Sequence, residues 1–544
     1  MKADLKTLAV IALIAVSGCV RSDNAHPFAH VAADPTVDLR QGQLVGVREG
    51  DLEVFRGIPY AAAPTDDRRW KAPSPPPDWS GVLDATAFGP SCIQPPVPER
   101  SLYYDPPLQT SEDCLTLNIW TQSRSAKAPV IVWIHGGSLR IGGSAQSMYD
   151  GSEFAGRGVV FVSLNYRLGA LGWLAHPELN VEAPDGISGN YGLLDEVAAL
   201  EWVRDNISAF GGDPANVTVM GESAGALSLT YLLTSPKAEG LFQKAIIESP
   251  NSRNFPELGQ AAYGARPAEE IGASKLSAMG FASIEAAREA SAQEITDKAG
   301  QAGFIPQGTI DGAVLPSQII DSFDDGAFAK VPVLAGFNSG EVRSQRLFLP
   351  QKPNDYEAAI VARYGALSND VLALYPGSDV DASMLATLRD GIYGWATERI
   401  VRKETEVDQP AFMYVFDYCY PSAEKADLCA FHASELPFVF GALDPDKLSP
   451  NWPVPDGEHD HAISSALLDY WTSFAATGQP ESARGPVWPA YGGDQAYLNI
   501  GQELEVGNNP MPGMFELHEE LVRQRKAAGA PWFLNIGLGA PPLE

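Results

Sequence analysis

Short apolar segments rich in β-branched residues recur along this chain, separated by stretches long enough to form helices. Segments that are apolar on both faces are typical of parallel strands that helices cover on both sides. Six such segments predict strands at residues 130–134, 159–164, 217–220, 245–247, 331–335 and 412–416. Their number and spacing favour an α/β protein built on one large, mostly parallel sheet.

The stretches between these segments carry helical patterns. Residues 193–210 have apolar side chains at helical spacing and end at Gly211 and Gly212, which predicts a β-α-β unit between the second and third strands. Two longer stretches, residues 254–307 and 350–408, are rich in alanine and glutamate. We expect them to form helical excursions that cap the sheet.

Charge excludes two classes of partner. The chain has 38 Lys and Arg against 68 Asp and Glu, a formal net charge of −30. A surface this acidic repels phosphate backbones and anionic lipid, so binding of nucleic acid is not expected.

A length of 544 residues alone would suggest several domains. The single predicted sheet instead favours one domain over residues 37–544.

The N-terminus has the features of an export signal. A lysine-bearing start precedes an apolar run, residues 8–16, which is too short to span a bilayer. Small residues followed by Cys19 resemble the processing site of bacterial lipoproteins, in which the cysteine is lipidated. We expect a signal peptide over residues 1–18, a tether over 19–36 and a membrane anchor at Cys19. An ordinary secretory signal is the alternative, and both predict export to the periplasm or outer membrane, or secretion.

Export makes the other four cysteines interpretable as disulfides, because oxidising compartments preserve them. Four cysteines allow three pairings. The preferred pairing joins Cys92 to Cys114 and Cys419 to Cys429, since each pair closes a short loop. The sequence has no cysteine and histidine cluster with zinc spacing, so neither a metal nor a cofactor is expected.

A nucleophile is predicted at Ser223. The segment Gly221-Glu222-Ser223-Ala224-Gly225 fits G-x-S-x-G, a pattern that is weak by itself in a glycine-rich chain. Here it follows the predicted strand 217–220 and precedes a helical run, residues 226–233. This strand-turn-helix context is the one in which a strained turn exposes a reactive serine.

Several motifs then point to one family. The glycine-rich loop His135-Gly136-Gly137-Ser138 leaves the first predicted strand, and the sequence Glu112-Asp113-Cys114-Leu115 follows the E-D-C-L pattern. With residues 165–169 and the block 189–225, they resemble the type-B carboxylesterase family, which includes the cholinesterases. The likeness runs from about Val37 to the C-terminus. It implies the α/β-hydrolase fold, with a large, mostly parallel sheet flanked by helices and capped by helical excursions.

The resemblance also implies the partners of Ser223. Gly336-Phe337-Asn338-Ser339-Gly340-Glu341 matches the family's acid motif and identifies Glu341, although Val342 stands where the family usually has glycine. Asp311 is the less favoured acid. His432, after the last predicted strand, matches the catalytic histidine. Of the other histidines, we expect His135 to be structural and both His459 and His461 to flank a solvated acidic loop.

Further site residues follow from the same likeness. The oxyanion is expected to be held by backbone N–H groups of Gly137, Ser138 and Ala224, and Ser138 departs from the third glycine that the family usually has. Ser249 matches a serine that the family keeps beside the triad. The mechanism implied is attack by Ser223 on an ester carbonyl, giving an acyl-enzyme that water hydrolyses.

The substrate pocket departs from that of the cholinesterases. Their choline-binding tryptophan is absent, and Tyr104 stands in its region, while Leu139 replaces an aromatic residue beside the oxyanion loop. Arg140 follows, and Arg253 and Arg343 lie near other site residues in sequence. Each arginine either pairs with a surface carboxylate or binds a carboxylate on the substrate, which would favour esters of di- or tricarboxylic acids.

Two classes of function remain open at this stage. The first is a hydrolase of small-molecule carboxylic esters, with amidase, lactonase or thioesterase action as a lesser branch. The second is a non-catalytic adhesion or binding module on the same fold. Retention of nucleophile, base and acid favours the enzyme. The sequence does not indicate the oligomeric state.

Overall fold

A computed structural model describes residues 34–107, 109–122, 124–532 and 536–543. Residues 35–544 form one compact unit. The expected signal peptide, the lipidation site Cys19 and all but the end of the tether lie outside the described residues. None of the described helices is long and apolar enough to cross a membrane.

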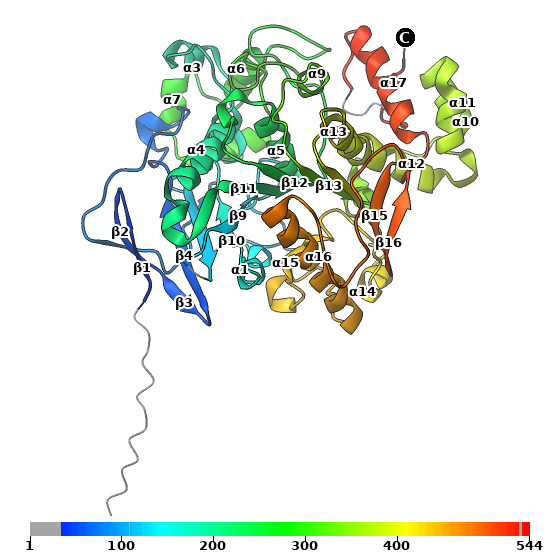
Figure 1. Cartoon of the computed structure of the whole chain (residues 1–544). Helices are drawn as coiled ribbons and strands as arrows, with labels where there is room; N and C mark the ends of the chain where they lie inside the picture. Colours follow the sequence, from blue (N-terminus) through cyan, green and yellow to red (C-terminus); the bar gives the residue numbers. More distant parts are fainter. Residues whose placement is uncertain (1–33, 108, 123, 533–535, 544) are drawn as a thin grey trace, which may run out of the picture. The chain divides into compact units, whose positions relative to one another are not determined.

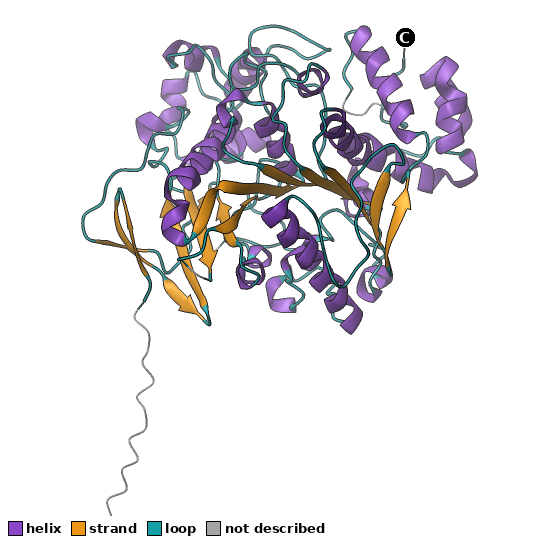
Figure 2. Ribbon diagram, in the orientation of Figure 1, coloured by secondary structure: helices purple, strands orange, loops and turns teal. Residues whose placement is uncertain are grey.

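An eleven-stranded sheet runs through the unit (Figures 1 and 2). Its strand order is β16-β15-β14-β13-β12-β11-β9-β10-β8-β4-β3. All six predicted strands are present and mutually parallel, as β9 (Ala128–Ile134), β10 (Val160–Leu164), β11 (Gly212–Glu222), β12 (Lys244–Glu248), β13 (Val333–Asn338) and β14 (Ala411–Phe416). The predicted large, mostly parallel sheet is therefore confirmed.

The sequence prediction missed the strands at both edges. On one side these are β8 (Thr116–Thr121), β4 (Leu52–Pro59) and β3 (Val47–Glu49), all antiparallel to their neighbours. On the other, β15 (Ala496–Ile500) continues the parallel order and β16 (Leu504–Asn508) pairs antiparallel with it. Smaller sheets join β1 (Thr36–Leu39), β2 (Gly42–Val45) and β5 (Val82–Asp84), and β6 (Ser91–Cys92) with β7 (Thr110–Ser111).

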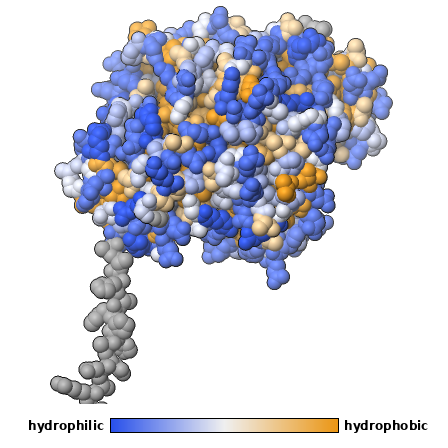
Figure 3. Space-filling model, viewed as in Figure 1, coloured by the Kyte–Doolittle hydropathy of each residue, from blue (hydrophilic) through white to orange (hydrophobic). Residues whose placement is uncertain are grey.

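Side chains of the central strands alternate between two hydrophobic cores, one on each face of the sheet. In β9, Val130, Val132 and Ile134 enter one core, whereas Ile131 and Trp133 enter the other. Successive side chains of a strand point to opposite faces, so burial of both faces accounts for the apolar run seen in the sequence of β9. The outer surface in the view of Figure 3 is mainly hydrophilic, with scattered apolar residues.

Helices cover both faces of the sheet (Figure 2). One face carries α4 (Tyr191–Asn206), α5 (Ala224–Thr234), α9 (Ile319–Asp324) and α13 (Trp395–Glu406), and the other carries α1 (Ser152–Gly156), α15 (Leu436–Phe440) and α16 (Glu458–Thr477). The stretch predicted as a helix at 193–210 is α4 followed by a 3₁₀ helix, Ile207–Phe210.

The two expected excursions are helical. The first contains α6 (Ala268–Ala278), α7 (Ile284–Arg288) and α8 (Ala292–Gln301). The second contains α10 (Tyr356–Tyr364), α11 (Ser368–Leu374), α12 (Val380–Arg389) and α13. The remaining helices are α2 (Gly169–Trp173), α3 (Pro177–Glu182), α14 (Pro421–Lys425) and α17 (Met514–Ala527).

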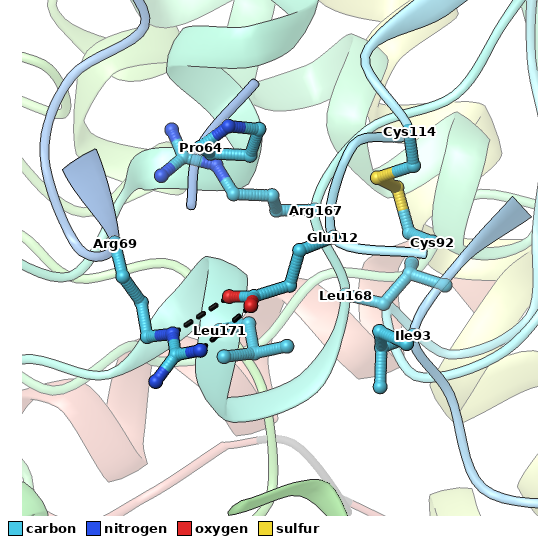
Figure 4. Close-up of a pocket in the computed structure, with 9 residues that line it drawn as sticks. All are labelled: Pro64, Arg69, Cys92, Ile93, Glu112, Cys114, Arg167, Leu168 and Leu171. Carbon is cyan, nitrogen blue, oxygen red and sulfur yellow. Dashed lines mark hydrogen bonds and ion pairs between the residues drawn. A yellow bond between two sulfur atoms is a disulfide. The ribbon is translucent and has the colours of Figure 1, made fainter. Parts of the chain in front are cut away.

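Two disulfides are present, Cys92–Cys114 and Cys419–Cys429, in the preferred pairing. The first lies beside a cavity of about 10 Å³, roughly enough for one water molecule. Arg69 forms a two-pronged ion pair with Glu112 at its wall, with both N–O distances 2.6 Å (Figure 4). The cavity is too small for an ester.

Candidate active site

The strand order reverses direction at β9, and this creates the site. From β9 the chain passes to β10 on one side and then to β11 on the other. In open α/β sheets, the loops that leave the carboxyl ends of strands at such a switch point diverge and leave a crevice. Ile134, the last residue of β9, pairs with Gly221 near the end of β11. The glycine-rich loop and the G-x-S-x-G turn therefore start side by side.

Ser223 stands in a strained turn between β11 and α5. Its φ of 56° and ψ of −115° are unfavourable for a residue with a Cβ atom. Close packing keeps the turn tight, because a Cβ at Gly225 would lie 2.0 Å from the carbonyl oxygen of Ile134. A Cβ at Gly221 would lie 2.8 Å from the carbonyl carbon of Gly225. The two glycines thus allow the serine to project from the start of a helix.

Three side chains from distant parts of the chain form one hydrogen-bonded line. The Oγ of Ser223 lies 2.8 Å from Nε2 of His432, and Nδ1 of His432 lies 2.5 Å from Oε2 of Glu341. Glu341 follows β13 and begins a 3₁₀ helix, Glu341–Phe348, while His432 lies in the loop after β14. In this arrangement the Nδ1–H donates to Glu341, which leaves Nε2 free to accept the serine proton.

Glu341 is itself held from two sides. Its Oε1 accepts hydrogen bonds from the hydroxyl of Ser249 at 2.6 Å and from the backbone N–H of Asn338 at 2.9 Å. Glu341 and Ser249 are both fully buried. Asp311, the less favoured acid, instead accepts hydrogen bonds from the backbone N–H groups of residues 313–315 and caps a turn. The structure therefore brings Glu341, and not Asp311, to His432.

A second carboxyl group faces the imidazole. Oε1 of Glu222, the residue before Ser223, lies 3.2 Å from Nε2 of His432, and both side chains are buried. Burial raises the pKa of Glu222 to about 7. Burial lowers the pKa of His432, but the carboxylates of Glu222 and Glu341 outweigh this effect and raise it to about 9. Groups this close titrate as a unit.

Two further buried glutamates surround this group. Burial, together with Glu222 and Glu341, raises the pKa of Glu435 to about 8, and its carboxyl accepts a hydrogen bond from the side chain of Asn338. Burial also raises the pKa of Glu248, whose Oε1 accepts from the indole of Trp471 at 2.7 Å. The site therefore contains several carboxyl groups whose pKa burial raises.

The loop after β9 forms a tight turn beside Ser223. Gly137, Ser138 and Leu139 all have positive φ, and a Cβ at Gly137 would lie 2.1 Å from the carbonyl oxygen of Ile141. The N–H groups of Gly137 and Ser138 donate to no acceptor among the described residues. Ala224 begins α5, where N–H groups lack intrahelical acceptors. The backbone N–H groups of Gly137, Ser138 and Ala224 are therefore available to donate hydrogen bonds to an oxyanion.

His135 holds this loop in place. Its ring stacks on Tyr166 with 4.6 Å between ring centroids, and the hydroxyl of Tyr166 donates to the carbonyl oxygen of His135. Burial lowers the pKa of His135 to about 4, so the ring is neutral. The expectation of a loop around His459 and His461 was wrong, because both lie in the first turn of α16.

The three arginines have different surroundings. Arg343 pairs with Asp427 at 3.0 Å, as expected for a surface cation, and Arg253 packs against the ring of Phe255. Arg140 is exposed and makes no ion pair with any described residue. Its Nη2 rests against Gly300 near the end of α8, at 3.4 Å from where a Cβ of Gly300 would lie. Leu139, beside it, is buried.

Sequence reasoning missed several residues that contact His432. The hydroxyl of Tyr103, and not of the neighbouring Tyr104, donates to the carbonyl oxygen of His432 at 3.0 Å. Tyr104 is half-buried. The ring of Tyr393 lies 5.0 Å from the imidazole, between centroids. Glu222 could have been found from the motif itself, whereas no local pattern marks Tyr103 or Tyr393.

Known proteins resemble this chain over most of its length. Residues 33–516 match the model of the carboxylesterase family. The fumonisin B1 esterase of Sphingopyxis macrogoltabida is 37% identical over 504 residues, covering 89% of this chain and 90% of that protein. The para-nitrobenzyl esterase of Bacillus subtilis (strain 168) is 37% identical over 487 residues, covering 87% and 96%.

Solved structures of esterases are also similar to this chain. A PNB esterase structure superimposes with a TM-score of 0.76 at 33% identity, covering 89% of this chain and 99% of that chain. A carboxylesterase of Geobacillus stearothermophilus gives a TM-score of 0.75 at 31% identity, with the same coverage. Within the described residues, no three His, Cys, Asp or Glu side chains are grouped so as to hold a metal ion.

Proposed function

The chain belongs to the carboxylesterase family and is a carboxylic-ester hydrolase, and we propose that Ser223, His432 and Glu341 are its nucleophile, base and acid. The observation that carries this proposal is the unbroken line of hydrogen bonds from the Ser223 hydroxyl through the imidazole to the buried carboxylate. A non-catalytic binding module would have no need of this alignment, nor of the strained backbone that exposes Ser223.

The reaction proceeds by two acyl transfers. Nε2 of His432 removes the Ser223 proton as Oγ attacks the ester carbonyl, and the resulting imidazolium then protonates the departing alkoxide. Water repeats the sequence on the acyl-enzyme, and the acid leaves. Glu341 keeps the proton on Nδ1 and stabilises the positive ring, while the hydroxyl of Ser249 and the N–H of Asn338 hold the Glu341 carboxyl in place.

The tetrahedral oxyanion is held by the N–H groups of Gly137, Ser138 and Ala224. The first two donors are unsatisfied among the described residues, and the positive φ of both residues holds them in a turn that cannot easily relax. Donors fixed in advance cost little reorganisation when the charge develops. Ser138 supplies the same backbone donor as a glycine would, and its side chain is exposed toward solvent.

The test uses Ser223→Ala and a matched pair of acid variants. On neutral p-nitrophenyl esters, Ser223→Ala is expected to lower kcat/KM by about 10⁴-fold or more. Glu341→Gln is expected to lose most of the activity, whereas Asp311→Asn should retain it if it folds. Turnover that survives Ser223→Ala, or greater loss in Asp311→Asn, would contradict the proposed triad. Amide, lactone and thioester analogues in the same panel measure the lesser branches.

Arg140 favours esters that carry a carboxylate in the acid part. It is two residues beyond the oxyanion loop, exposed, and without an ion pair among the described residues in a chain of net charge −30. The planar guanidinium binds carboxylates through two parallel hydrogen bonds. One relative is named as an esterase of fumonisin B1. We expect Arg140→Gln to lower kcat/KM for hemisuccinate-type esters about 10-fold or more and to spare neutral esters.

The matched control is Arg343→Gln, because Arg343 already pairs with Asp427. It should affect anionic and neutral esters equally. Equal losses on both ester types in Arg140→Gln would contradict the preference.

The enzyme is further proposed to be exported and tethered through Cys19. Radiolabelled palmitate incorporation that persists in Cys19→Ser would contradict the anchor.

A further inference from the structure

A widened helical turn lies next to the triad. The helices α12 and α13 are joined by a π-helical turn, Asp390–Gly394, in which the N–H of Trp395 donates to the carbonyl oxygen of Asp390, five residues back. Such turns insert one extra residue, so every side chain beyond them is rotated around the helix, and they are frequent at functional sites. The hydroxyl of Thr397 donates to the carbonyl oxygen of Tyr393 at 2.9 Å.

The turn is fastened to the loop that carries the acid. Asp390 accepts hydrogen bonds from the hydroxyl of Tyr375 at 2.9 Å and from Nε of Arg389 at 2.6 Å. Nη1 of Arg389 in turn donates to the carbonyl oxygen of Ser339, at 3.4 Å, two residues before Glu341. The widened turn and the catalytic acid therefore keep a fixed relation to each other.

The side chain that this turn presents to the site is Tyr393. Its ring lies 5.0 Å from the His432 ring between centroids, at an interplanar angle of 31°, in a tilted stack. Its hydroxyl is hydrogen-bonded to the side-chain amide of Gln345 at 3.2 Å, which lies at a kink four residues after Glu341. Burial raises the pKa of Tyr393, so the phenol stays neutral. Tyr393 is buried, with 5% of the residue exposed, so its ring shields this side of the imidazole from water.

The hydrogen bonds to His432 leave its ring faces unrestrained. Glu341 holds the Nδ1 edge, and Tyr103 holds the backbone carbonyl oxygen. Neither contact prevents the imidazole from tilting out of line with Ser223. A neighbouring aromatic ring prevents this tilting by direct contact with the imidazole. The negative face of its π-system also attracts a positively charged ring.

We propose that Tyr393 is a positioning residue of this esterase, whose ring holds the His432 imidazole in line with Ser223 and stabilises the imidazolium formed in each acyl transfer. The inference rests on the proposed triad. It assigns a role to the π-helical turn, which directs Tyr393 to the ring. Gln345 anchors the phenol at its far end, so the ring has little freedom to move away.

The experiment must separate the electronic contribution of this ring from packing. The groups that face His432 are Glu222, Glu341, Glu435, Ser223, Tyr103 and Tyr393. Only position 393 is varied, first as Tyr393→Phe and then as phenylalanine with one, three and five ring fluorines, incorporated by codon reassignment. These side chains have similar volumes, but fluorination progressively removes the negative charge of the ring face. Tyr393→Leu removes the ring altogether.

The readout is the pH profile of kcat/KM on a neutral ester. Loss of the ring destabilises the imidazolium, so the acid limb should move to lower pH by about half to one unit while the plateau falls about 5- to 20-fold. Tyr393→Phe should remain within about 3-fold of the wild type, because it keeps the ring and loses one neutral hydrogen bond. The fluorinated series should fall between Phe and Leu in order of fluorine count.

A purely structural role would give a different result. It would lower the plateau without moving the acid limb, and fluorination would have no graded effect; either result overturns the inference. Tyr364→Leu, which removes a buried tyrosine in a separate hydrophobic cluster, is the stability control and should not move the limb. If Tyr393→Leu does not fold, the fluorinated series decides. Failure of the triad itself would appear separately, as turnover that survives Ser223→Ala.

Discussion

Replacing Glu222 by glutamine tests how the charge next to His432 is used. Oε1 of Glu222 lies 3.2 Å from Nε2, on the same nitrogen that must accept the Ser223 proton, and it has no hydrogen-bond partner among the described residues. Glutamine keeps the size and shape of this side chain and removes the negative charge. The backbone turn around Ser223 should therefore be preserved.

The size of the effect follows from the distance. Two unit charges 3.2 Å apart interact by about 1 kcal/mol in bulk water and by about 5 kcal/mol at an effective dielectric constant of about 20. These energies correspond to about 1 to 4 pKa units. Glu222 is itself only partly ionised near neutral pH, because burial raises its pKa to about 7. A shift of about 2 units lies within this range and is the one we expect.

The sign is fixed by which form of His432 the charge favours. A carboxylate stabilises the imidazolium, so its removal lowers the pKa of His432 from about 9 toward the ordinary value for histidine. The unprotonated ring is the active base. The acid limb of the kcat/KM profile should therefore move to lower pH, and the plateau should fall about 100-fold as the imidazolium in the transition state loses the same stabilisation of about 2 pKa units.

The assay is kcat/KM on a neutral ester between pH 4.5 and 10, because a neutral substrate adds no titration of its own. Glu435→Gln is the matched control, since Glu435 bonds Asn338 and does not contact the imidazole. Its acid limb should move in the same direction by a smaller amount. An acid limb in Glu222→Gln that stays in place, or that moves to higher pH, would refute the reasoning.

Three further outcomes are expected. Gly137→Ala should lower kcat about 10²- to 10³-fold in stopped-flow or steady-state assays, because its Cβ would lie 2.1 Å from the carbonyl oxygen of Ile141 and displace an oxyanion donor. Joint replacement of Cys92 and Cys114 by serine should lower the free energy of unfolding by about 3 kcal/mol in urea titrations, given their separation of 22 residues. Glu404→Gln should flatten the pH dependence of unfolding between pH 5 and 9, since burial raises the pKa of Glu404 to about 9 and keeping it neutral costs about 3 kcal/mol by pH 7.

The central strands were predictable from sequence, whereas the edges were not, for a physical reason. Most central strands that contribute to two cores are apolar at nearly every position, and this pattern stands out in any window. Edge strands such as β16, which has five residues and none of them buried, carry no such run and resemble a loop in sequence. Burial on both faces does not always give an apolar run: β8 is fully buried but reads Thr-Leu-Asn-Ile-Trp-Thr, and Asn118 bonds the hydroxyls of Ser144 and Ser163.

Some residues of the site were also predictable from sequence, and others were not. Ser223 was identifiable because its turn, strand and helix are contiguous in sequence. His432 lies 209 residues from it and 91 from Glu341, so only a family resemblance could connect them. Tyr393 was beyond reach even with that resemblance. A helical period of 3.6 residues assigns faces only while the helix is regular, and one inserted residue in the π-helical turn changes the face on which every later residue lies.

The formal charge of −30 overstates the negative charge of the folded protein. It treats every carboxyl group as ionised, yet burial raises the pKa to about 8 for Glu196 and Glu435 and to about 9 for Glu404. These groups are protonated at pH 7, and each makes the protein one unit less negative than the count. Among them, Glu435 acts electrostatically on His432. An anionic ester therefore meets less repulsion at the catalytic centre than the sequence implies, and a contact made by Arg140 has correspondingly less to overcome.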